Sequence, residues 1–252
     1  MNHQIIGRKI IELDTVDSTN NYSLSLLEQG KIDEGTVIFA RSQSAGQGLN
    51  GNSWESEKNK NIIISIIIYP EFLPLTHHFM LNIFSSLAIH DFINNKIPGQ
   101  RTFIKWSNDV YIDQKKVAGI LIKNAIRGDG FQYSIIGLGI NINQLEFKSA
   151  APNPVSLRKL THIRYDLKES LDELCKILDQ RYKELKNRNF KKLTDDYHKN
   201  LLFINVLRNY LINDKLVKGK ILGIAVDGKL VLEIEGGKLL YCDMKEIAYI
   251  LD

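Results

Sequence analysis

Short apolar runs bounded by turn residues recur along the first 140 positions of the chain. The longest run, Ile62–Tyr69, is interrupted by Ser65 and is typical of a buried strand. Two further runs, Lys116–Ala125 and Phe131–Asn141, flank an Arg-Gly-Asp-Gly turn, which predicts a hairpin. The other strands of this part are predicted over residues 10–13, 36–40, 102–105 and 110–112.

Three stretches have the spacing of helices. An Asp-Ser-Thr sequence at 17–19 supplies N-cap residues for a short helix that ends at Gly30. Residues 77–93 and 166–186 carry apolar residues at a helical period. Single helices between strands that meet in hairpins predict an α+β fold: a mixed, mostly antiparallel sheet with helices to one side.

The pattern changes near the C-terminus to short strands separated by glycine turns. Asp227-Gly228 and Gly236-Gly237 are hairpin signals between strands predicted over 215–224, 229–234 and 239–242. This change predicts two domains, a larger one over residues 1–200 and a small closed barrel over residues 201–252.

Composition places the 252-residue chain among ordinary globular proteins, with 44% hydrophobic and 25% charged residues. The net charge of +4 is local, because residues 181–199 hold seven basic and three acidic side chains. We interpret that stretch as a solvated helical face and not as a nucleic-acid contact.

Neither export nor a membrane span is indicated. No apolar run reaches the roughly 18 residues that a span requires, and the N-terminus lacks the apolar core of a signal peptide. Cys175 and Cys242 form neither a CxxC pair nor a disulfide framework, so we expect buried free thiols in a reducing cytoplasm.

A glycine-rich loop lies between two predicted strands. Residues 43–54 read Gln-Ser-Ala-Gly-Gln-Gly-Leu-Asn-Gly-Asn-Ser-Trp. The backbone N–H groups of such a loop can cradle an anion, but it opens no helix and lacks the Lys-Ser/Thr of a nucleotide P-loop. A plain flexible loop therefore stays open as an alternative, with Trp54 as an anchor that packs it down.

Two further segments of the predicted sheet contain residues suited to binding or catalysis. A hairpin around residues 113–115 places Asp109 near Lys116, which is suited to phosphoryl or ammonium chemistry or forms a plain surface ion pair. Gly137 and Gly139 lie inside a predicted strand, where glycine usually marks the close approach of a ligand or another backbone. The side chain of Asn141 then either forms hydrogen bonds with an amide or the edge of an adenine ring, or caps the strand.

Together these segments resemble biotin protein ligases, which attach biotin to a carrier lysine of biotin-dependent carboxylases. The resemblance covers nearly the whole chain. Residues 17–20 resemble the opening biotin-contact motif, 43–54 the glycine-arginine loop, 105–121 the KWPNDxY…KxxGIL signature and 137–143 the GxGxNxN strand. The C-terminal strands resemble the family's small SH3-like barrel.

The resemblance implies a role for each motif residue. Lys116 and Asp109 are the catalytic residues, with Lys116 between the biotin carboxylate and the ATP α-phosphate. The biotin-binding residues implied are Ser18, Thr19, Gln43, Gly46, Gly48, Lys116 and Gly119. The ATP-binding residues implied are Gln47, Leu49, Trp54, Asn108 and Asn141. ATP and Mg²⁺ are the implied cofactors, with the metal site unassigned beyond the neighbourhood of Asp109.

The sequence departs from the family in its loop. The family's arginine positions hold Gln47, Leu49 and Asn52, and Ser107 replaces a proline. Losing each charge-assisted contact should cost roughly 2–3 kcal/mol. Either lysines outside the motif compensate, with Lys58, Lys60 and Lys105 the nearest, or activity and retention of the intermediate are reduced.

The expected function is ATP-dependent biotinylation of a carrier lysine through biotinyl-5′-AMP. Two alternatives stay open: a lipoate or octanoyl ligase of the same fold, and a non-catalytic module that binds biotin or the carrier. The expected partners are biotin and a biotin carboxyl carrier protein or domain, with a homodimer also open. Because nine residues precede the strand at Ile10, we expect no DNA-binding helix-turn-helix and no repressor function.

Overall fold

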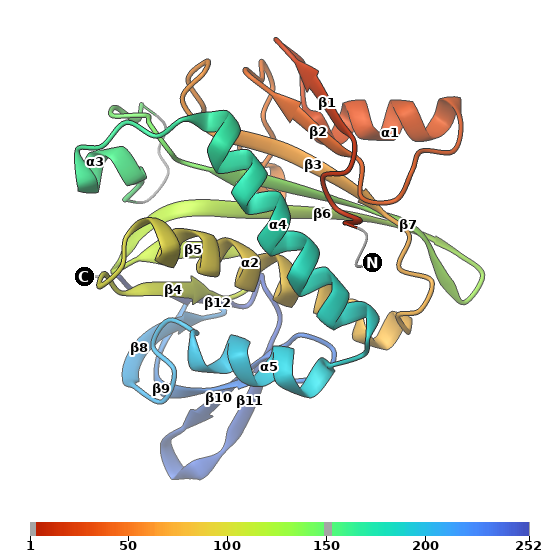
Figure 1. The fold of residues 1–252 in the computed structure, drawn as a ribbon. Coiled ribbons are helices and arrows are strands. Elements are labelled where there is room, and N and C mark those ends of the chain that lie inside the picture. The colour runs from red at the N-terminus through yellow and green to blue at the C-terminus, as the bar shows by residue number, and fades with distance from the viewer. Residues whose placement is uncertain (1–3, 149–152, 252) are drawn as a thin grey trace.

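Two β-sheets and the helices packed on them make up the computed structural model, which describes residues 4–148 and 153–251 (Figure 1). The large sheet contains β1 (Ile10–Leu13), β2 (Val37–Ala40), β3 (Ile62–Ile68), β4 (Thr102–Lys105), β5 (Asp109–Ile112), β6 (Lys115–Arg127) and β7 (Gly130–Ile140). The helices are α1 (Thr19–Gln29), α2 (Met80–Lys96), α3 (Leu157–Thr161), α4 (Leu167–Lys186) and α5 (Phe190–Lys199). The short 3-10 helices are η1 (Leu49–Gly51), η2 (Leu75–His77) and η3 (Glu235–Gly237).

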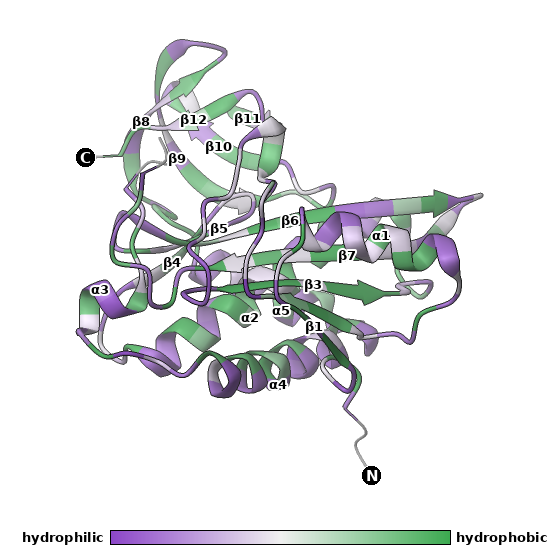
Figure 2. Ribbon diagram, turned by 90° about the horizontal axis from the view of Figure 1, so that it is seen from above, coloured by the Kyte–Doolittle hydropathy of each residue, from purple (hydrophilic) through white to green (hydrophobic). Residues whose placement is uncertain are grey.

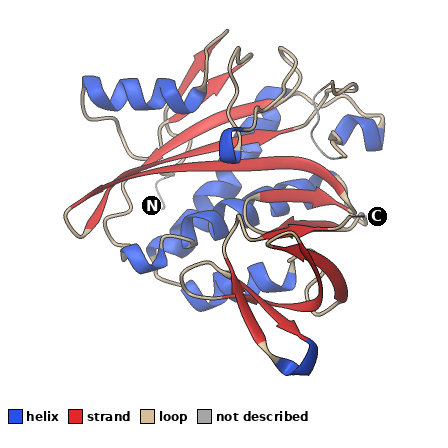
Figure 3. Cartoon of the chain, turned by 180° about the vertical axis from the view of Figure 1, so that it is seen from behind, coloured by secondary structure: helices blue, strands red, loops and turns tan. Residues whose placement is uncertain are grey.

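The large sheet has the strand order β1-β2-β3-β7-β6-β5-β4. Its β1–β2 pair is parallel and its other pairs are antiparallel, which confirms the mixed, mostly antiparallel sheet. The long β6–β7 hairpin projects beyond the neighbouring strands (Figure 3). The hairpin lies in the middle of the sheet, with β3 beside β7 and β5 beside β6.

Helices cover both faces of this sheet. Alternate residues of β3, among them Ile62 and Ile64, join the main hydrophobic core, and α2 and α4 lie side by side along that face (Figure 2). On the opposite face Ser65 donates a hydrogen bond to Thr19 of α1, and its hydroxyl oxygen lies 2.6 Å from Oδ1 of Asn20 on the same helix. The apolar run of β3 is therefore buried throughout, because both faces are covered.

A five-stranded antiparallel sheet forms the C-terminal part, in the order β11-β10-β9-β8-β12. Its strands are β8 (Leu207–Ile212), β9 (Lys215–Ile224), β10 (Leu230–Ile234), β11 (Leu239–Cys242) and β12 (Ile247–Tyr249). The sequence analysis predicts a closed barrel here. Within the described residues, however, β11 and β12 are the two ends of the ladder and do not pair.

The junction between the two sheets is fixed by backbone and side-chain contacts. Ile104 of β4 donates to the carbonyl of Asn200 at 2.7 Å and accepts from the N–H of Leu202 at 2.8 Å. The indole Nε1 of Trp106 donates to the carbonyl of Gly228 at 2.8 Å. Core residues of both parts belong to one continuous cluster, so the small sheet is packed firmly on the large one.

The basic stretch at 181–199 is more structured than a solvated face. Arg181 is 14% exposed and forms ion pairs with Asp91, Glu184 and Asp196. These carboxylates come from three helices, so the guanidinium joins α2, α4 and α5. The expectation of a solvated face is therefore wrong for Arg181, because α2 packs against it.

The expectation that both cysteines are buried free thiols is confirmed. Cys175 and Cys242 are buried free thiols, and burial raises the pKa of Cys175 to about 12. Among the described helices, none combines the length and apolar character needed to cross a bilayer.

We predict a pH-dependent contribution of His198 to stability. Its Nε2 accepts a hydrogen bond from the N–H of Ile224 at 3.0 Å, and burial lowers its pKa, opposed by Asp195. The unfolded chain therefore binds this proton more readily, so stability present above about pH 6.5 is lost as pH falls toward the folded pKa. Denaturant unfolding at pH 7.5 and 5.5 should show a smaller difference in His198→Gln than in the wild type. An equal difference in both proteins would contradict the prediction.

Candidate functional site

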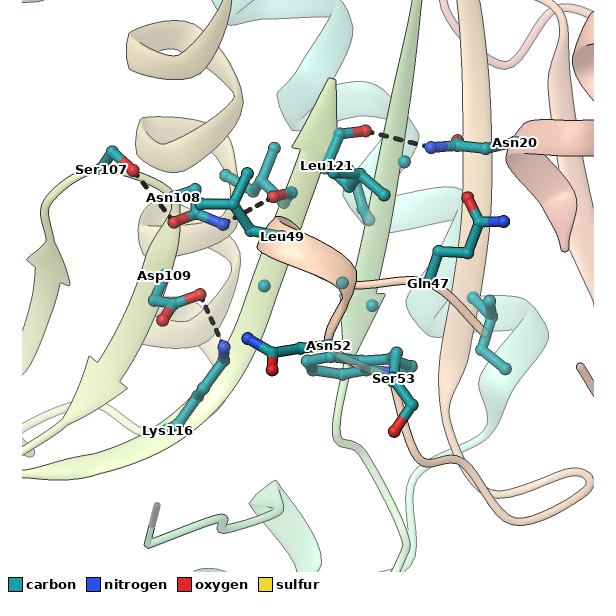
Figure 4. Close-up of a pocket in the computed structure, with 18 of the residues that line it drawn as sticks. Asn20, Gln47, Leu49, Asn52, Ser53, Ser107, Asn108, Asp109, Lys116 and Leu121 are labelled. Carbon is teal, nitrogen blue, oxygen red and sulfur yellow. Dashed lines mark hydrogen bonds and ion pairs between the residues drawn. The ribbon is translucent and has the colours of Figure 1, made fainter. Parts of the chain in front are cut away.

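A cavity of about 240 Å³ opens on the face of the large sheet that carries α1. It is lined by α1, the 43–54 loop, the central strands, the β4–β5 turn and residues of the small sheet (Figure 4). The motifs that are far apart in the sequence therefore meet around one space.

The floor of the cavity consists of β3, β7 and β6. Strand register places Ile63, Gly139 and Gly119 in one row and Ser65, Gly137 and Leu121 in the next. A Cβ at Gly139 would lie 2.4 Å from the Trp54 ring, and one at Gly137 would lie 2.6 Å from Oδ1 of Asn20. Side chains thus approach the two strand glycines closely, as their position in the sequence predicts.

One end of the cavity offers neutral hydrogen-bonding groups. The N–H and hydroxyl of Thr19 both donate to Oε1 of Gln43, at 2.8 and 3.1 Å. The hydroxyl of Ser65 in turn donates to Oγ1 of Thr19 at 2.7 Å. Ser18 and Thr19 are 2% and 3% exposed, so a polar ligand group bound here exchanges water for fixed partners.

The opposite end is charged. Lys116 and Asp109 form an ion pair at 2.7 Å, as the predicted hairpin of β5 and β6 requires. Lys105 also lines the cavity, with its Nζ 4.9 Å from the ring centre of Tyr249. Burial lowers the pKa of Lys105, the charge of Lys116 lowers it further, and Asp109 opposes both. Two ammonium groups can therefore meet the anionic parts of a ligand.

Trp54 lies between the glycine floor and the charged end. Its ring covers Gly119 and Gly139, and the ammonium of Lys116 is 5.7 Å from the ring centre. Its Nε1 is buried and has no hydrogen-bond partner in the described part of the chain. The residue therefore anchors the loop and also forms a wall of the cavity.

The β4–β5 turn contributes polar groups to the same wall. The amide of Asn108 donates to the carbonyl of Ile120 at 2.9 Å and its Oδ1 accepts from Ser107 at 3.0 Å. The peptide bond between Trp106 and Ser107 is cis.

Two residues implied by the resemblance do not line the cavity. Asn141 is 3% exposed and donates to the carbonyl of Val155 at 3.1 Å, so it holds the segment before α3. Gly46 lies behind the loop, where a Cβ would meet the carbonyl oxygen of Trp54 at 2.5 Å. The other implied residues are among those that line the cavity: Ser18, Thr19, Gln43, Gln47, Gly48, Leu49, Trp54, Asn108, Asp109, Lys116 and Gly119.

Few of the lysines expected to compensate for the missing loop arginines reach the cavity. Lys58 pairs with Asp14 at 2.6 Å and does not line the cavity. Lys60 does not line it either, so Lys105 is the one candidate of the three that reaches it.

Sequence reasoning missed the contribution of the small sheet. Met244, Ile247 and Tyr249 line the charged end, and Sδ of Met244 accepts a hydrogen bond from Ser107 at 2.9 Å. No motif marks these residues, since their place depends on how the two sheets pack. Asn20, which also lines the cavity, belongs to the opening motif but received no role of its own.

The described residues contain no cluster of three or more His, Cys, Asp or Glu suited to a metal ion. Asp109 is the one carboxylate among the described residues of the lining. A metal here would thus need ligands from a bound substrate.

Known proteins with related sequences include ligases. The bifunctional ligase/repressor BirA of Bacillus spizizenii is 30% identical over 246 residues, which span 94% of this chain and 74% of that protein. The biotin–[acetyl-CoA-carboxylase] ligase of Mycobacterium tuberculosis is 26% identical, over 95% of this chain and 89% of that one.

Solved structures agree with the sequence relatives. The biotin protein ligase of Aquifex aeolicus in complex with biotin and ATP superposes with a TM-score of 0.78 at 26% identity, covering 96% of this chain and 98% of that one. The profile of the biotin/lipoate A/B protein ligase family matches residues 12–141, which is more than half of the chain. The chain belongs to the biotin/lipoate A/B protein ligase family.

Proposed function

We propose that the protein is a biotin protein ligase, which uses ATP to join biotin to a carrier lysine through biotinyl-5′-AMP. The observation that carries this proposal is the polarity of the cavity. Neutral hydrogen-bonding groups lie at one end, bare glycine backbone forms the floor, and Lys116 with Asp109 lies at the other end. Biotin has the matching polarity, with a neutral ureido ring joined by an apolar tail to a carboxylate.

The neutral end is assigned to the ureido ring. Its N–H groups and carbonyl oxygen need partners once buried, and Ser18, Thr19 and Gln43 supply both donors and acceptors. The tail then extends along the floor past Gly119, where the missing Cβ leaves room for a ligand, and the Trp54 ring that covers this glycine must make way for the tail. Gly48 brings loop backbone to the other side of the tail.

The charged end is assigned to adenylation. A biotin carboxylate oxygen attacks the α-phosphorus of ATP, the bond to the β-phosphate bridging oxygen breaks, and pyrophosphate leaves. Lys116 lies where the two anions meet, so its charge offsets their repulsion and the charge of the transition state. Asp109 positions the ammonium, and Lys105 provides a second cation for the phosphates.

The adenosine part is assigned to the wall beside this end. Trp54 and Asn108 offer an aromatic face and an amide, and Leu49 covers the site from the loop. Gln47, by contrast, lies on the side of Asn20 and not at this end (Figure 4). In the second step the amine of the carrier lysine attacks the acyl carbon, the bond to AMP breaks, and the amine loses a proton. The carboxylate of Asp109 attracts the incoming ammonium before that proton is lost.

Mg²⁺ is proposed to enter with ATP. This ion is usually held by one or two carboxylates together with substrate phosphates. Asp109 fits that limited role as the carboxylate among the described lining residues. When bound, Mg²⁺ would neutralise phosphate charge.

The alternatives are not favoured. The Mycobacterium tuberculosis relative and the Aquifex aeolicus structure, which both match the chain over most of its length, are named as biotin ligases, although the family itself includes lipoate ligases. A non-catalytic module would not need a partly buried Lys116–Asp109 pair, whose side chains are 21% and 14% exposed.

Residues 1–200 are proposed to hold the biotin site, and residues 201–252 to complete the ATP end through Tyr249 and its neighbours. The carrier is proposed to dock beside β6, whose residues beyond Gly119 extend past β5 and leave a free edge among the described strands. The same edge suits a homodimer.

Mass spectrometry of a carrier domain tests the proposed function. After incubation with the protein, biotin and ATP, one carrier lysine should bear biotin, and a carrier with that lysine changed to arginine should stay unmodified. An unmodified carrier under conditions where the protein cleaves ATP with biotin would contradict transfer to the carrier.

We predict that Lys116→Ala slows adenylation. Removing the cation between two anionic substrates should lower the rate of pyrophosphate release at least ~100-fold. Lys115→Ala is the matched control, since that neighbour is exposed and lies outside the lining. A near-normal rate in Lys116→Ala would remove this residue from the mechanism.

Tyr249→Leu should weaken ATP binding at the charged end of the cavity and leave biotin binding at the neutral end unchanged. The ring holds the Lys105 ammonium at the charged end, whereas the neutral end comes from residues before position 200. We expect the KM for ATP to rise about 3- to 10-fold, in line with losing one cation–π contact, with an unchanged Kd for biotin by calorimetry. Equal weakening of both ligands would argue against the domain assignment.

Leu49→Arg should slow escape of biotinyl-adenylate. The loop carries no arginine at 47, 49 or 52, so its ordering over the phosphate lacks charged contacts. Stopped-flow tryptophan fluorescence, with Trp54 and Trp106 as reporters, measures the release rate. A rate as slow as in arginine-bearing relatives, unchanged by Leu49→Arg, would show that other groups such as Lys105 retain the intermediate.

A further inference from the structure

A lysine outside the cavity lining reaches the loop that covers the cavity. Lys123 lies on β6, two residues beyond Leu121, and its Nζ donates a hydrogen bond to Oε1 of Gln47 at 2.9 Å. The same ammonium lies 3.3 Å from Oδ1 of Asn21 on α1. Lys123 therefore joins the sheet, the helix and the loop at one point.

Between Gln43, which bonds Thr19, and Trp54, which packs on the strand glycines, the loop is held mainly by its own backbone. The N–H of Gly48 donates to the carbonyl of Asn52 at 2.7 Å, and the N–H of Trp54 donates to the carbonyl of Gly46 at 2.9 Å. The base of the loop is tied to residues 16–17 by two further backbone bonds. A tip folded on itself above a fixed base can move as a unit, so a side chain that fastens it controls its position.

The contact lies at the neutral end of the cavity. Asn21 donates to Oδ2 of Asp17 at 2.8 Å, and Asp17 precedes Ser18 and Thr19. Figure 4 places Gln47 on the side of Asn20, away from the Lys116–Asp109 pair. The amide of Asn21 thus links the ammonium of Lys123 to the carboxylate of Asp17. The same ammonium is directed toward Gln47 of the loop.

We propose that Lys123 is a positioning residue that fastens the 43–54 loop over the cavity through Gln47 and thereby sets how fast a bound ligand leaves. A ligand enters or leaves the cavity only when the loop is open, so a contact that holds the loop closed slows both steps. The identity of that ligand as biotin or its adenylate rests on the proposed function. The contact by which Lys123 fastens the loop does not depend on the proposed function.

Amide hydrogen exchange on the ligand-free protein tests the fastening directly. Lys123→Met should speed exchange of residues 46–54 about 3- to 10-fold, the effect of losing one partly exposed charged hydrogen bond. Lys123→Arg should stay near the wild type. Arg127→Met is the matched control, because Arg127 is an exposed cation at the far end of the same strand. Unchanged exchange in Lys123→Met would overturn the proposal.

A charge exchange distinguishes a specific contact from general damage to β6. Gln47→Lys should open the loop by placing two cations together, and adding Lys123→Glu should return exchange to the wild-type rate. Exchange that stays fast in the double variant would overturn the proposal, since a re-formed pair must close the loop.

Biotin release provides the functional readout. With biotin alone as the ligand, Lys123→Met should release it about 3- to 10-fold faster, and association should also speed up, because the contact closes the loop in the ligand-free protein. Release at the wild-type rate would overturn the role in ligand retention. If the wild type binds no biotin, the proposed function fails, and hydrogen exchange still decides whether Lys123 fastens the loop.

Discussion

The lack of side chains at Gly119, Gly137 and Gly139 is the constraint on which the site depends. These residues lie in the centre of the large sheet, where β6, β7 and β3 are held in register by continuous hydrogen bonding. Any Cβ at Gly139 or Gly137 would displace Trp54 or Asn20, which lie directly above. The sheet thus supplies a flat floor, and its rigidity fixes the distance between the two ends of the cavity.

The charged end follows from the same strands. The β5–β6 register sets Lys116 beside Asp109, and the β4–β5 turn delivers Lys105 and Asn108 to the same wall. A paired and partly buried lysine keeps its charge in place without a partner from the loop. This arrangement is consistent with a loop that has no arginine, because the cations that the chemistry needs come from strands.

The sequence predicts the large sheet well because its strands carry their own signals. The apolar run of β3, the β6–β7 turn and the paired glycines each point to a buried, ligand-facing sheet. Most residues implied by the family motifs lie around the cavity for the same reason. Asn141 is the instructive exception, since a position in the motif does not show whether an amide faces the ligand or a neighbouring carbonyl.

What the sequence could not predict depends on packing between distant segments. Tyr249 and Met244 reach the cavity through the docking of the small sheet, and Lys123 meets Gln47 across 76 positions of chain. Arg181 is drawn into an ion-pair network because α2 and α5 pack beside it. None of these contacts has a local period or spacing that marks it in advance.

The central claim is that this cavity joins the carboxylate of biotin to the α-phosphate of ATP. Exchange of labelled pyrophosphate into ATP measures that reversible step on the intact protein, without a carrier. Exchange should require biotin and should not be supported by lipoate or octanoate. Exchange with lipoate or octanoate in place of biotin, or none with biotin, would contradict the central claim.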